Sequence, residues 1–393
     1  MSITMNELRT KTDPIAEKVV AWRRYLHEHP EVSFHEENTS QYVYDQLCAV
    51  DGLTVTRPTK TSVMARLIGD RPGRVLAIRA DMDALPILEE NTFDFVSKNP
   101  GAMHACGHDG HTAMLLGTAT VLAGMREHIA GEIRFLFQHA EELFPGGAQE
   151  MVDAGVLEGV DQVIGTHLWA SLPCGQIAIA PGPVMAAPDT FTITIKGKGG
   201  HAAHPDQTVD SIAIGAQLVT NLQHVVARNR DPLKPMVLSV TTFHAGTAFN
   251  VIPDSATLSG TVRTFDASLR AAAPGMMERV IRGVTDAHGA SYEFKYTNGY
   301  HPVVNDAALT AQLKAAFVEQ FGDVIVQDAV PSMGGEDFSA YQQKVPGCFF
   351  FIGAGNVEKG IIYPHHHPKF TVDEDALPVG VQSFVTAVFA LMD

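Results

Sequence analysis

The sequence lacks any unbroken apolar run of about 18 residues, the length that a membrane-spanning helix needs. Its first residues, MSITMNELRTKTDP, also lack the apolar stretch of a signal peptide, so we expect a cytoplasmic protein. Basic residues are scarce: 28 Lys and Arg stand against 44 Asp and Glu, and the formal net charge is −16. Such a surface repels nucleic acid and anionic membranes, so we expect neither as a partner. A small-molecule partner fits this composition better.

Cysteine is also scarce, which excludes a disulfide framework in a chain of this length. The four cysteines are Cys48, Cys106, Cys174 and Cys348, and no two of them form a CxxC pair. We expect Cys48, Cys174 and Cys348 to be small buried apolar side chains, the usual role of a free cysteine. Cys106 differs because it stands among histidines.

The length and the apolar content together predict two domains. The chain has 393 residues, of which 45% are hydrophobic, so it can bury a large core. The spacing of Ile15, Val19, Trp22 and Leu26, and of Thr39, Val43 and Leu47, predicts two amphipathic helices. Short apolar runs at 75–78, 133–137, 163–165 and 348–353 then predict buried strands, separated by helical patterns such as 110–124. This alternation indicates an α/β domain with a sheet covered by helices.

A change of pattern near residue 188 predicts an inserted domain. Period-two alternation in FTITIKG is followed by a helical stretch at 208–227, by strands at 237–243 and 256–264, and by a further helix and strand. The order β-α-β-β-α-β is that of a ferredoxin-like α+β unit. We therefore expect residues 188–297 to be inserted into a domain made of residues 1–187 and 298–393.

Side chains that can bind metal or move protons follow several of the predicted strands. Asp81 and Asp83 follow the first strand, Glu141 and Glu142 follow the second, His167 follows the third, and Cys106 and His108 open the intervening helix. Because functional groups of an open α/β sheet gather beyond the carboxyl ends of its strands, we expect these side chains to lie close together.

Thiolate, imidazole and carboxylate together suit Zn²⁺ or a similar divalent ion. A set rich in carboxylates is typical of an open catalytic site, whereas closed structural zinc sites use Cys and His. In the adjacent pair Glu141 and Glu142, one carboxylate can bind metal while the other takes a proton from water. The alternative for such a pair is a solvated helix N-terminus.

Six segments in this order resemble the dinuclear-metal peptidase and aminoacylase family. They are RADMDALP, HACGHDGHTAMLLG, AEE, GKGGHAAHP, FNVIPDSATLSGTVRTF and GGEDFSAY. The similarity spans nearly the whole chain and is greatest to the branch of hippurate hydrolase, N-acyl-L-amino acid amidohydrolase and the indole-acetyl-amino-acid hydrolases. It implies a zinc-peptidase-like catalytic domain with a mostly parallel sheet, and hydrolysis of the amide bond of N-acyl amino acids.

The resemblance also implies a metal site with two divalent ions per subunit, Zn or Mn. Cys106 would bridge both ions, with Glu142 and His366 completing one ligand set. His108 and His167 would complete the other. Glu141 would be the general base, and Asp83 would orient a ligand imidazole.

In the inserted domain, the resemblance implies a lid and dimerisation role. His201 would stabilise the oxyanion in the active site of a neighbouring subunit, which makes a homodimer or a dimer-based tetramer the expected assembly. Asn250 and Arg263 would hold the carboxylate of the substrate, because a guanidinium matches that planar group. Gly334 and Gly335 would let the backbone approach the same carboxylate. From the residues alone, a solvated strand residue is the favoured interpretation of Arg263, and an ordinary turn is the alternative for the two glycines.

The sequence departs from this branch at His139, which stands where the branch has proline; we assign it no role. The last ligand lies in a run of three histidines, and we choose His366, with His365 and His367 as alternatives. Asp109 and His111 are interpreted as supporting residues at a helix start rather than as ligands.

Other functions are compatible with parts of this pattern. A dipeptidase or carboxypeptidase would use the same residues. A cysteine hydrolase would use Cys106 as a nucleophile activated by His108 or His111. Its activity would survive removal of metal by a chelator. A non-catalytic binding protein would lack a base or a ligand, and none is missing from the sequence.

Overall fold

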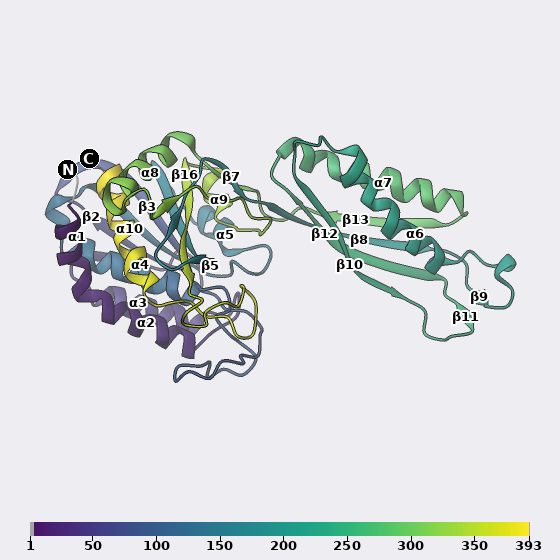
Figure 1. The fold of residues 1–393 in the computed structure, drawn as a ribbon, viewed down its shortest axis with the longest axis horizontal. Coiled ribbons are helices and arrows are strands. Elements are labelled where there is room, and N and C mark those ends of the chain that lie inside the picture. The colour runs from purple at the N-terminus through teal and green to yellow at the C-terminus, as the bar shows by residue number, and fades with distance from the viewer. Residues whose placement is uncertain (1–3, 393) are drawn as a thin grey trace. The chain divides into compact units, whose positions relative to one another are not determined.

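The computed structural model describes residues 4–392, which form two compact units (Figure 1). The first unit contains the residues up to Val184, the segment Val304–Val330 and the residues from Asp337 onward. The second unit contains Met185–Val303 and Pro331–Glu336. The first three residues of the N-terminal segment considered above lie outside the described residues.

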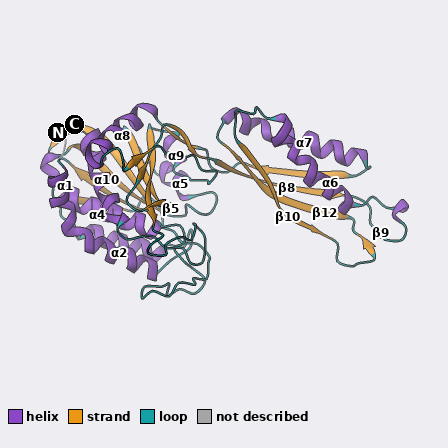
Figure 2. Cartoon of the chain, viewed as in Figure 1, coloured by secondary structure: helices purple, strands orange, loops and turns teal. Residues whose placement is uncertain are grey.

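A sheet flanked by helices forms the centre of the first unit (Figure 2). It has eight strands, and four parallel neighbours, β4, β3, β5 and β16, lie in its middle. In sheet order the strands are β1 (Leu53–Thr56), β2 (Val63–Ile68), β4 (Ala130–Gln138), β3 (Arg71–Asp81), β5 (Gln162–Pro173), β16 (Gly347–Gly355), β6 (Ile177–Ala178) and β15 (Val326–Gln327). The prediction of a mostly parallel sheet flanked by helices is confirmed. β1 and β2 add an antiparallel edge that the sequence did not predict.

Helices cover this sheet, and α4 is the most enclosed of those in the first unit. The α-helices are α1 (Met5–Thr12), α2 (Ala16–Glu28), α3 (Glu37–Cys48), α4 (His108–Ala123), α5 (Gly147–Asp153), α8 (Ala307–Phe321), α9 (Ser339–Gln342) and α10 (Ala376–Leu391). α4 packs against β3, α2 and α10, and nearly all its residues are buried. Gly117 permits this approach, because a Cβ there would lie 2.7 Å from Val19 Cγ2. The core therefore holds the start of α4 firmly against the sheet.

The second unit is a four-stranded antiparallel sheet covered by two helices, α6 (Ser211–His224) and α7 (Ala267–Ala287). The strands, in sheet order, are β10 (Met236–Ala245), β12 (Ser255–Thr264), β8 (Ala187–Lys196) and β13 (Ser291–Thr297). A further strand pair of this unit is β9 (Gly200–His201) with β11 (Val251–Ile252). Two short strands, β7 (Gly182–Met185) and β14 (Val303–Asn305), also pair, and most of their residues belong to the first unit. The order along the chain, β8-α6-β10-β12-α7-β13, is the β-α-β-β-α-β order of a ferredoxin-like unit.

The cysteines only partly follow the expectation. Cys348 is buried and Cys174 is half-buried, but Cys48 is exposed, so its prediction as a buried side chain was wrong. Cys48 is the last residue of α3, whose buried face is formed by Thr39, Ser40, Val43 and Leu47. In the described part of the chain, no helix has both the length and the apolar character that crossing a membrane requires.

Candidate metal centre

The site begins where neighbouring parallel strands end at one edge of the first unit's sheet. β3 ends at Asp81 and β4 ends two residues before Ala140, while β5 carries His167 at its middle, two residues past the last residue that pairs with β3. These three strands are adjacent in the order β4-β3-β5, so the ends of β4 and β3 lie beside this part of β5. The expected gathering of polar groups at this edge is therefore present.

The start of α4 brings Cys106 and His108 to the same edge. Gly107, between them, takes φ +99°, a left-handed conformation that glycine adopts without a steric cost. Cys106 Sγ lies 3.4 Å from His167 Nε2. Cys106, His108 and His167 form one group whose ligand atoms all lie within 4.8 Å of one another.

The ring nitrogens of this group are arranged as metal ligands require. His108 Nδ1 lies 2.9 Å from the carbonyl oxygen of Asp83 and 3.2 Å from its Oδ1, so Nδ1 carries the proton and donates it. His167 Nδ1 likewise donates to the carbonyl oxygen of Leu168, at 2.6 Å. When each ring is neutral, the lone pair is then on Nε2, and His108 Nε2 is buried without a hydrogen-bond partner. A buried ring nitrogen without a hydrogen-bond partner is suited to bind a metal ion.

Cys106 belongs to a second group, with Glu142 and His366. His366 Nε2 lies 3.1 Å from Glu142 Oε1, and its backbone N–H donates to the carbonyl oxygen of Ala105 at 2.8 Å. The His366 backbone has φ +65°, which is unusual for a residue with a Cβ. Cys106 is therefore the residue that the two groups share.

The structure distinguishes the three adjacent histidines by their contacts. His365 Nε2 accepts the N–H of Ala170 at 3.2 Å, and His367 Nδ1 accepts the N–H of Lys369 at 3.0 Å. Among the three, His366 alone belongs to a group of potential metal ligands.

Glu141 lies beside the two groups without completing either of them. It is 7% exposed, and it forms a further group with His108 and Glu142. The backbone N–H of Asp337 points to Glu141 Oε1 at 3.4 Å. A buried carboxylate at this place is suited to accept a proton beside a metal ion.

The charges in the site are unbalanced without cations. Burial, together with Glu142 and Glu141, raises the pKa of the Cys106 thiol well above its usual range. Burial opposes the charge on His108, but Asp81 and Asp83 overcome it and raise its pKa to about 10. Burial and the neighbouring imidazoles lower the pKa of His167. Divalent ions would neutralise these carboxylates and favour the thiolate, so the residues present fit a metal.

The supporting residues at the helix start, His111 and Asp109, form buried side-chain hydrogen bonds. His111 Nδ1 donates to Asp81 Oδ1 at 2.6 Å, and His111 Nε2 accepts the N–H of Leu168 at 2.8 Å. Asp109 Oδ2 accepts from Arg23 Nε at 2.9 Å and contacts His27 Nδ1 at 2.8 Å. The contacts of both His111 and Asp109 are those of residues that hold the helix start in place.

The remaining candidate residues lie on the second unit. His201 and Asn250 are exposed and lie close to each other, since Ala202 N–H donates to the carbonyl oxygen of Asn250 at 3.1 Å. Arg263 is a half-buried residue of β12 that hydrogen-bonds Thr261. The carbonyl oxygen of Gly334 accepts Ala186 N–H at 2.9 Å, and a Cβ on Gly335 would lie 2.5 Å from Pro188 Cγ.

Several residues that contact the site could not be recognised from the residues next to them in the sequence. Arg79 is buried and donates to Asp81 at 2.6 Å and to Asp337 at 2.8 Å. Glu36 accepts the N–H of Ala140 at 2.8 Å. His139, which received no role, contacts Glu150 Oε2 through Nε2 at 2.9 Å.

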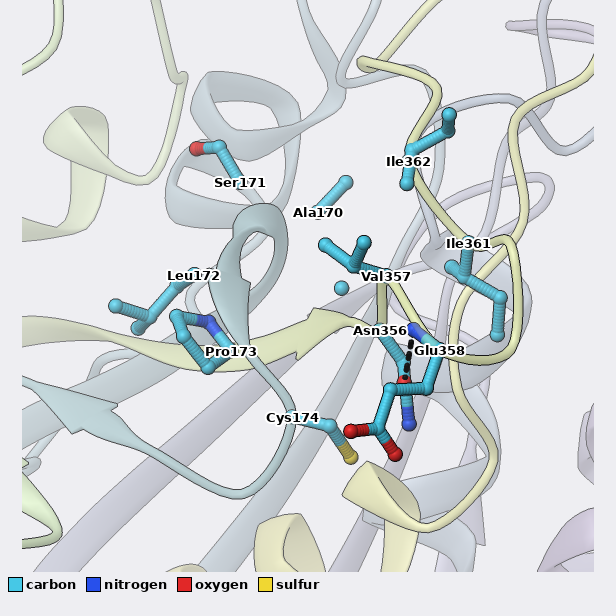
Figure 3. Close-up of a pocket in the computed structure, with 11 residues that line it drawn as sticks. Ala170, Ser171, Leu172, Pro173, Cys174, Asn356, Val357, Glu358, Ile361 and Ile362 are labelled. Atoms are coloured by element: carbon cyan, nitrogen blue, oxygen red, sulfur yellow. Dashed lines mark hydrogen bonds between the residues drawn. The ribbon is translucent and has the colours of Figure 1, made fainter.

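A cavity of about 460 Å³ lies on the two segments that carry His167 and His366 (Figure 3). Its walls include Ala170, three residues after His167, and Ile362, four residues before His366. Figure 3 shows the loop on one side of it, closed by a hydrogen bond from Glu358 N–H to Asn356. None of the residues that line the cavity belongs to a potential metal-ligand group, so the chemistry is to be sought at the strand ends.

The α/β fold and the two donor groups around Cys106 define a metal-dependent hydrolase. The pattern of Peptidase family M20/M25/M40 matches residues 77–390, and the chain belongs to this family. It is 65% identical over 303 residues to the N-acyl-L-amino acid amidohydrolase of Geobacillus stearothermophilus, covering 77% of this chain and 82% of the relative. It is 42% identical over 380 residues to thermostable carboxypeptidase 2 of Saccharolobus solfataricus, covering 96% of each.

The fold has solved relatives. A dinuclear metal binding peptidase of the M20 family from Bacillus subtilis superposes with a TM-score of 0.84 at 39% identity, over 97% of this chain and 99% of that one. The family resemblance inferred from the sequence motifs is thus confirmed.

Proposed function

We propose that the protein removes the acyl group from N-acyl amino acids, with Glu141 as the general base. The observation that carries the proposal is Cys106, which is common to two donor groups, with Glu141 beside them. The 65% identity to a relative named N-acyl-L-amino acid amidohydrolase supports the substrate class. The products are a carboxylic acid and a free amino acid.

The proposed cofactor is a pair of divalent ions per subunit, Zn or Mn. Cys106, His108 and His167 would hold one ion, and Cys106, Glu142 and His366 would hold the other. When bound, such ions polarise the substrate carbonyl and lower the pKa of water from 15.7 towards about 7. Asp83, at 3.2 Å from His108 Nδ1, keeps the lone pair of that ring on Nε2.

The residues of the chain then move the proton and hold the substrate. Glu141 takes a proton from the attacking water and returns it to the leaving amine. His201 donates to the oxyanion that develops on the former carbonyl oxygen. Asn250 and Arg263 hold the carboxylate of the amino acid, and Gly334 and Gly335 let the backbone approach it.

We further propose that residues 188–297 act as a lid and dimerisation domain in a cytoplasmic homodimer or dimer-based tetramer. β10 is an edge strand whose C-terminal half is exposed. An edge strand has unpaired backbone groups with which a second chain can pair. Large exposed apolar side chains accompany it, namely Phe243, Phe249 and Val251. Four free cysteines fit a reducing compartment.

A dipeptidase or carboxypeptidase is the alternative function. The relative at 42% identity that is named a thermostable carboxypeptidase favours it. A peptide substrate would have the same amino acid on the nitrogen side of the scissile amide as an N-acyl amino acid has. Its acyl side would be an amino acid residue, with a free or substituted amine.

The test is release of free amine from a substrate panel by protein loaded with Zn²⁺ or Mn²⁺. The panel contains N-acetyl and N-benzoyl amino acids, dipeptides, and N-blocked dipeptides that report carboxypeptidase activity. We expect the N-acyl amino acids to be cleaved fastest, chelation to abolish the reaction and added metal to restore it. The Glu141→Gln protein is the control for spontaneous or contaminating hydrolysis.

Each rival predicts a different result. Faster cleavage of peptides supports the alternative, and activity that survives chelation but is lost on thiol alkylation supports a cysteine nucleophile. If the metal-loaded protein cleaves nothing in the panel, the proposed hydrolysis is wrong.

A further inference from the structure

Glu36 is a buried carboxylate outside the potential metal-ligand groups. It has no exposed surface and lies at the N-cap position of α3, at the end of the loop that joins α2 to α3. Its side chain does not cap α3. Instead, Oε1 accepts the backbone N–H of Ala140 at 2.8 Å and that of Phe34 at 3.0 Å, while Thr61 Oγ1 donates to Oε2 at 3.4 Å. The carboxylate therefore links its own loop to a backbone segment that lies 104 residues further along the chain.

Both backbone segments are in an unfavourable conformation at the residue that donates. Ala140 has φ +49° and Phe34 has φ +67°, and residues with a Cβ seldom adopt such left-handed angles. Ala140 directly precedes Glu141, and its carbonyl oxygen accepts Gly147 N–H at 3.0 Å. The φ angle of Ala140 sets the direction in which the chain continues into Glu141. Glu36 thus holds the backbone at the residue before the proposed base.

The same loop supports the other side of the site. Ser33 Oγ donates to Asp83 Oδ2 at 2.6 Å, and this oxygen also accepts the backbone N–H of Glu142 at 3.0 Å. The ring of Phe34 packs edge-on to that of His139, with centroids 5.8 Å apart. The backbone on either side of Glu141 is therefore tied to this loop, through Glu36 at Ala140 and through Ser33 and Asp83 at Glu142.

We propose that Glu36 is a positioning residue for Glu141, acting by holding Ala140 in its left-handed conformation. This inference rests on the proposed function. It requires that Glu36 reach Ala140 with a well-placed acceptor oxygen, and it does not require a negative charge. The two requirements are separated by two conservative variants.

Glu36→Gln keeps the length of the side chain and an acceptor oxygen but has no charge. Glu36→Asp keeps the charge but is one methylene too short to reach Ala140. In metal-loaded protein we expect Glu36→Asp to lower kcat about 30-fold and Glu36→Gln to stay within about threefold, because small misplacements of a catalytic group cost up to about 100-fold. KM and metal content should stay near wild type in both variants.

A second-site substitution tests the route through Ala140. Glycine adopts left-handed angles without the Cβ penalty, so adding Ala140→Gly to Glu36→Asp should restore kcat by about fivefold or more. Asn305→Ala is the matched control for simple loss of stability, since Asn305 is another buried side chain that bonds backbone, at Phe349 and Ala180. Asn305→Ala should leave kcat within about twofold of wild type, because it removes hydrogen bonds that lie away from the site.

The inference is overturned if Glu36→Gln is the more impaired variant, since the charge would then be what matters. It is also overturned if Glu36→Asp loses no more activity than Asn305→Ala, or if Ala140→Gly restores nothing. Failure of the proposed function is visible earlier and separately, as a wild-type protein that releases no amine.

Discussion

Replacing Cys106 with serine tests whether one side chain serves both donor groups. Serine keeps the size of cysteine, but its hydroxyl is a poor substitute for a thiolate on Zn²⁺. Because Cys106 is common to both groups, we expect the affinity for both ions to fall. His366→Ala is the matched comparison, since it removes a donor from one group alone.

The expected loss of thermal stability follows from the linkage between metal binding and folding. An ion present at 100 times its dissociation constant stabilises the folded protein by about 2.7 kcal/mol, so two ions contribute about 5 kcal/mol. In a unit of the size of the first one, loss of about 5 kcal/mol lowers the melting temperature by roughly 10 °C. His366→Ala should lose about half of this metal-dependent stabilisation.

The assay is elemental analysis after dialysis at a fixed free-metal concentration, together with thermal unfolding with and without metal. We expect about two ions per chain in wild type, about one in His366→Ala and less than one in Cys106→Ser. The metal-free melting temperatures of the three proteins serve as the control for effects on the fold itself. A Cys106→Ser protein that keeps one ion firmly, as His366→Ala does, would refute the shared thiolate.

Three further predictions concern the remaining residues. Glu141→Gln should lower kcat by roughly 1,000-fold at unchanged metal content, and a parallel loss of metal would show that Glu141 is a ligand instead. Mixing inactive His201→Ala and Glu141→Gln chains should restore about a quarter of wild-type activity if His201 acts in a neighbouring subunit of a two-fold dimer, whereas no recovery would place it in its own. Burial raises the pKa of Glu36 from 4.5 to about 7. The free energy of folding that the protonated Glu36 contributes is therefore fully present below pH 4.5. It is lost as the pH rises through about 7, and the loss is about 3 kcal/mol. In metal-free protein, urea unfolding should show this loss in wild type and not in Glu36→Gln; a difference between the two that is independent of pH would contradict it.

The central strands and the helices that enclose them could be predicted from the sequence because their residues face apolar surroundings on both sides. β16 is buried along its entire length and reads as an apolar run. β1 could not be predicted in this way, because it is a four-residue edge strand with no fully buried residue. Its place depends on pairing with β2, a contact that the local pattern does not contain.

The candidate ligands could be predicted because strand ends collect them and because their spacing is local. Strand ends and spacing could not choose among His365, His366 and His367, and the family resemblance alone favoured His366. In the structure the three differ by the left-handed backbone at His366 and by the bonds that occupy its neighbours. The ion pair between Arg79 and Asp337 could not be predicted either, because it joins residues 258 positions apart. Long-range contacts of this kind leave no periodicity in the chain.

The positions at which local rules fail are concentrated around the site. The residues with a Cβ and a positive φ in the described part of the chain are Phe34, Ala140 and His366. Ala140 precedes Glu141, His366 contacts Glu142, and Phe34 shares an acceptor oxygen with Ala140. Each costs conformational free energy of about 1–3 kcal/mol that the surrounding packing and hydrogen bonds must offset. A protein under selection for stability alone would not keep these costs together in one place, so their clustering is an argument, independent of the motifs, that this edge of the sheet is where the chemistry occurs.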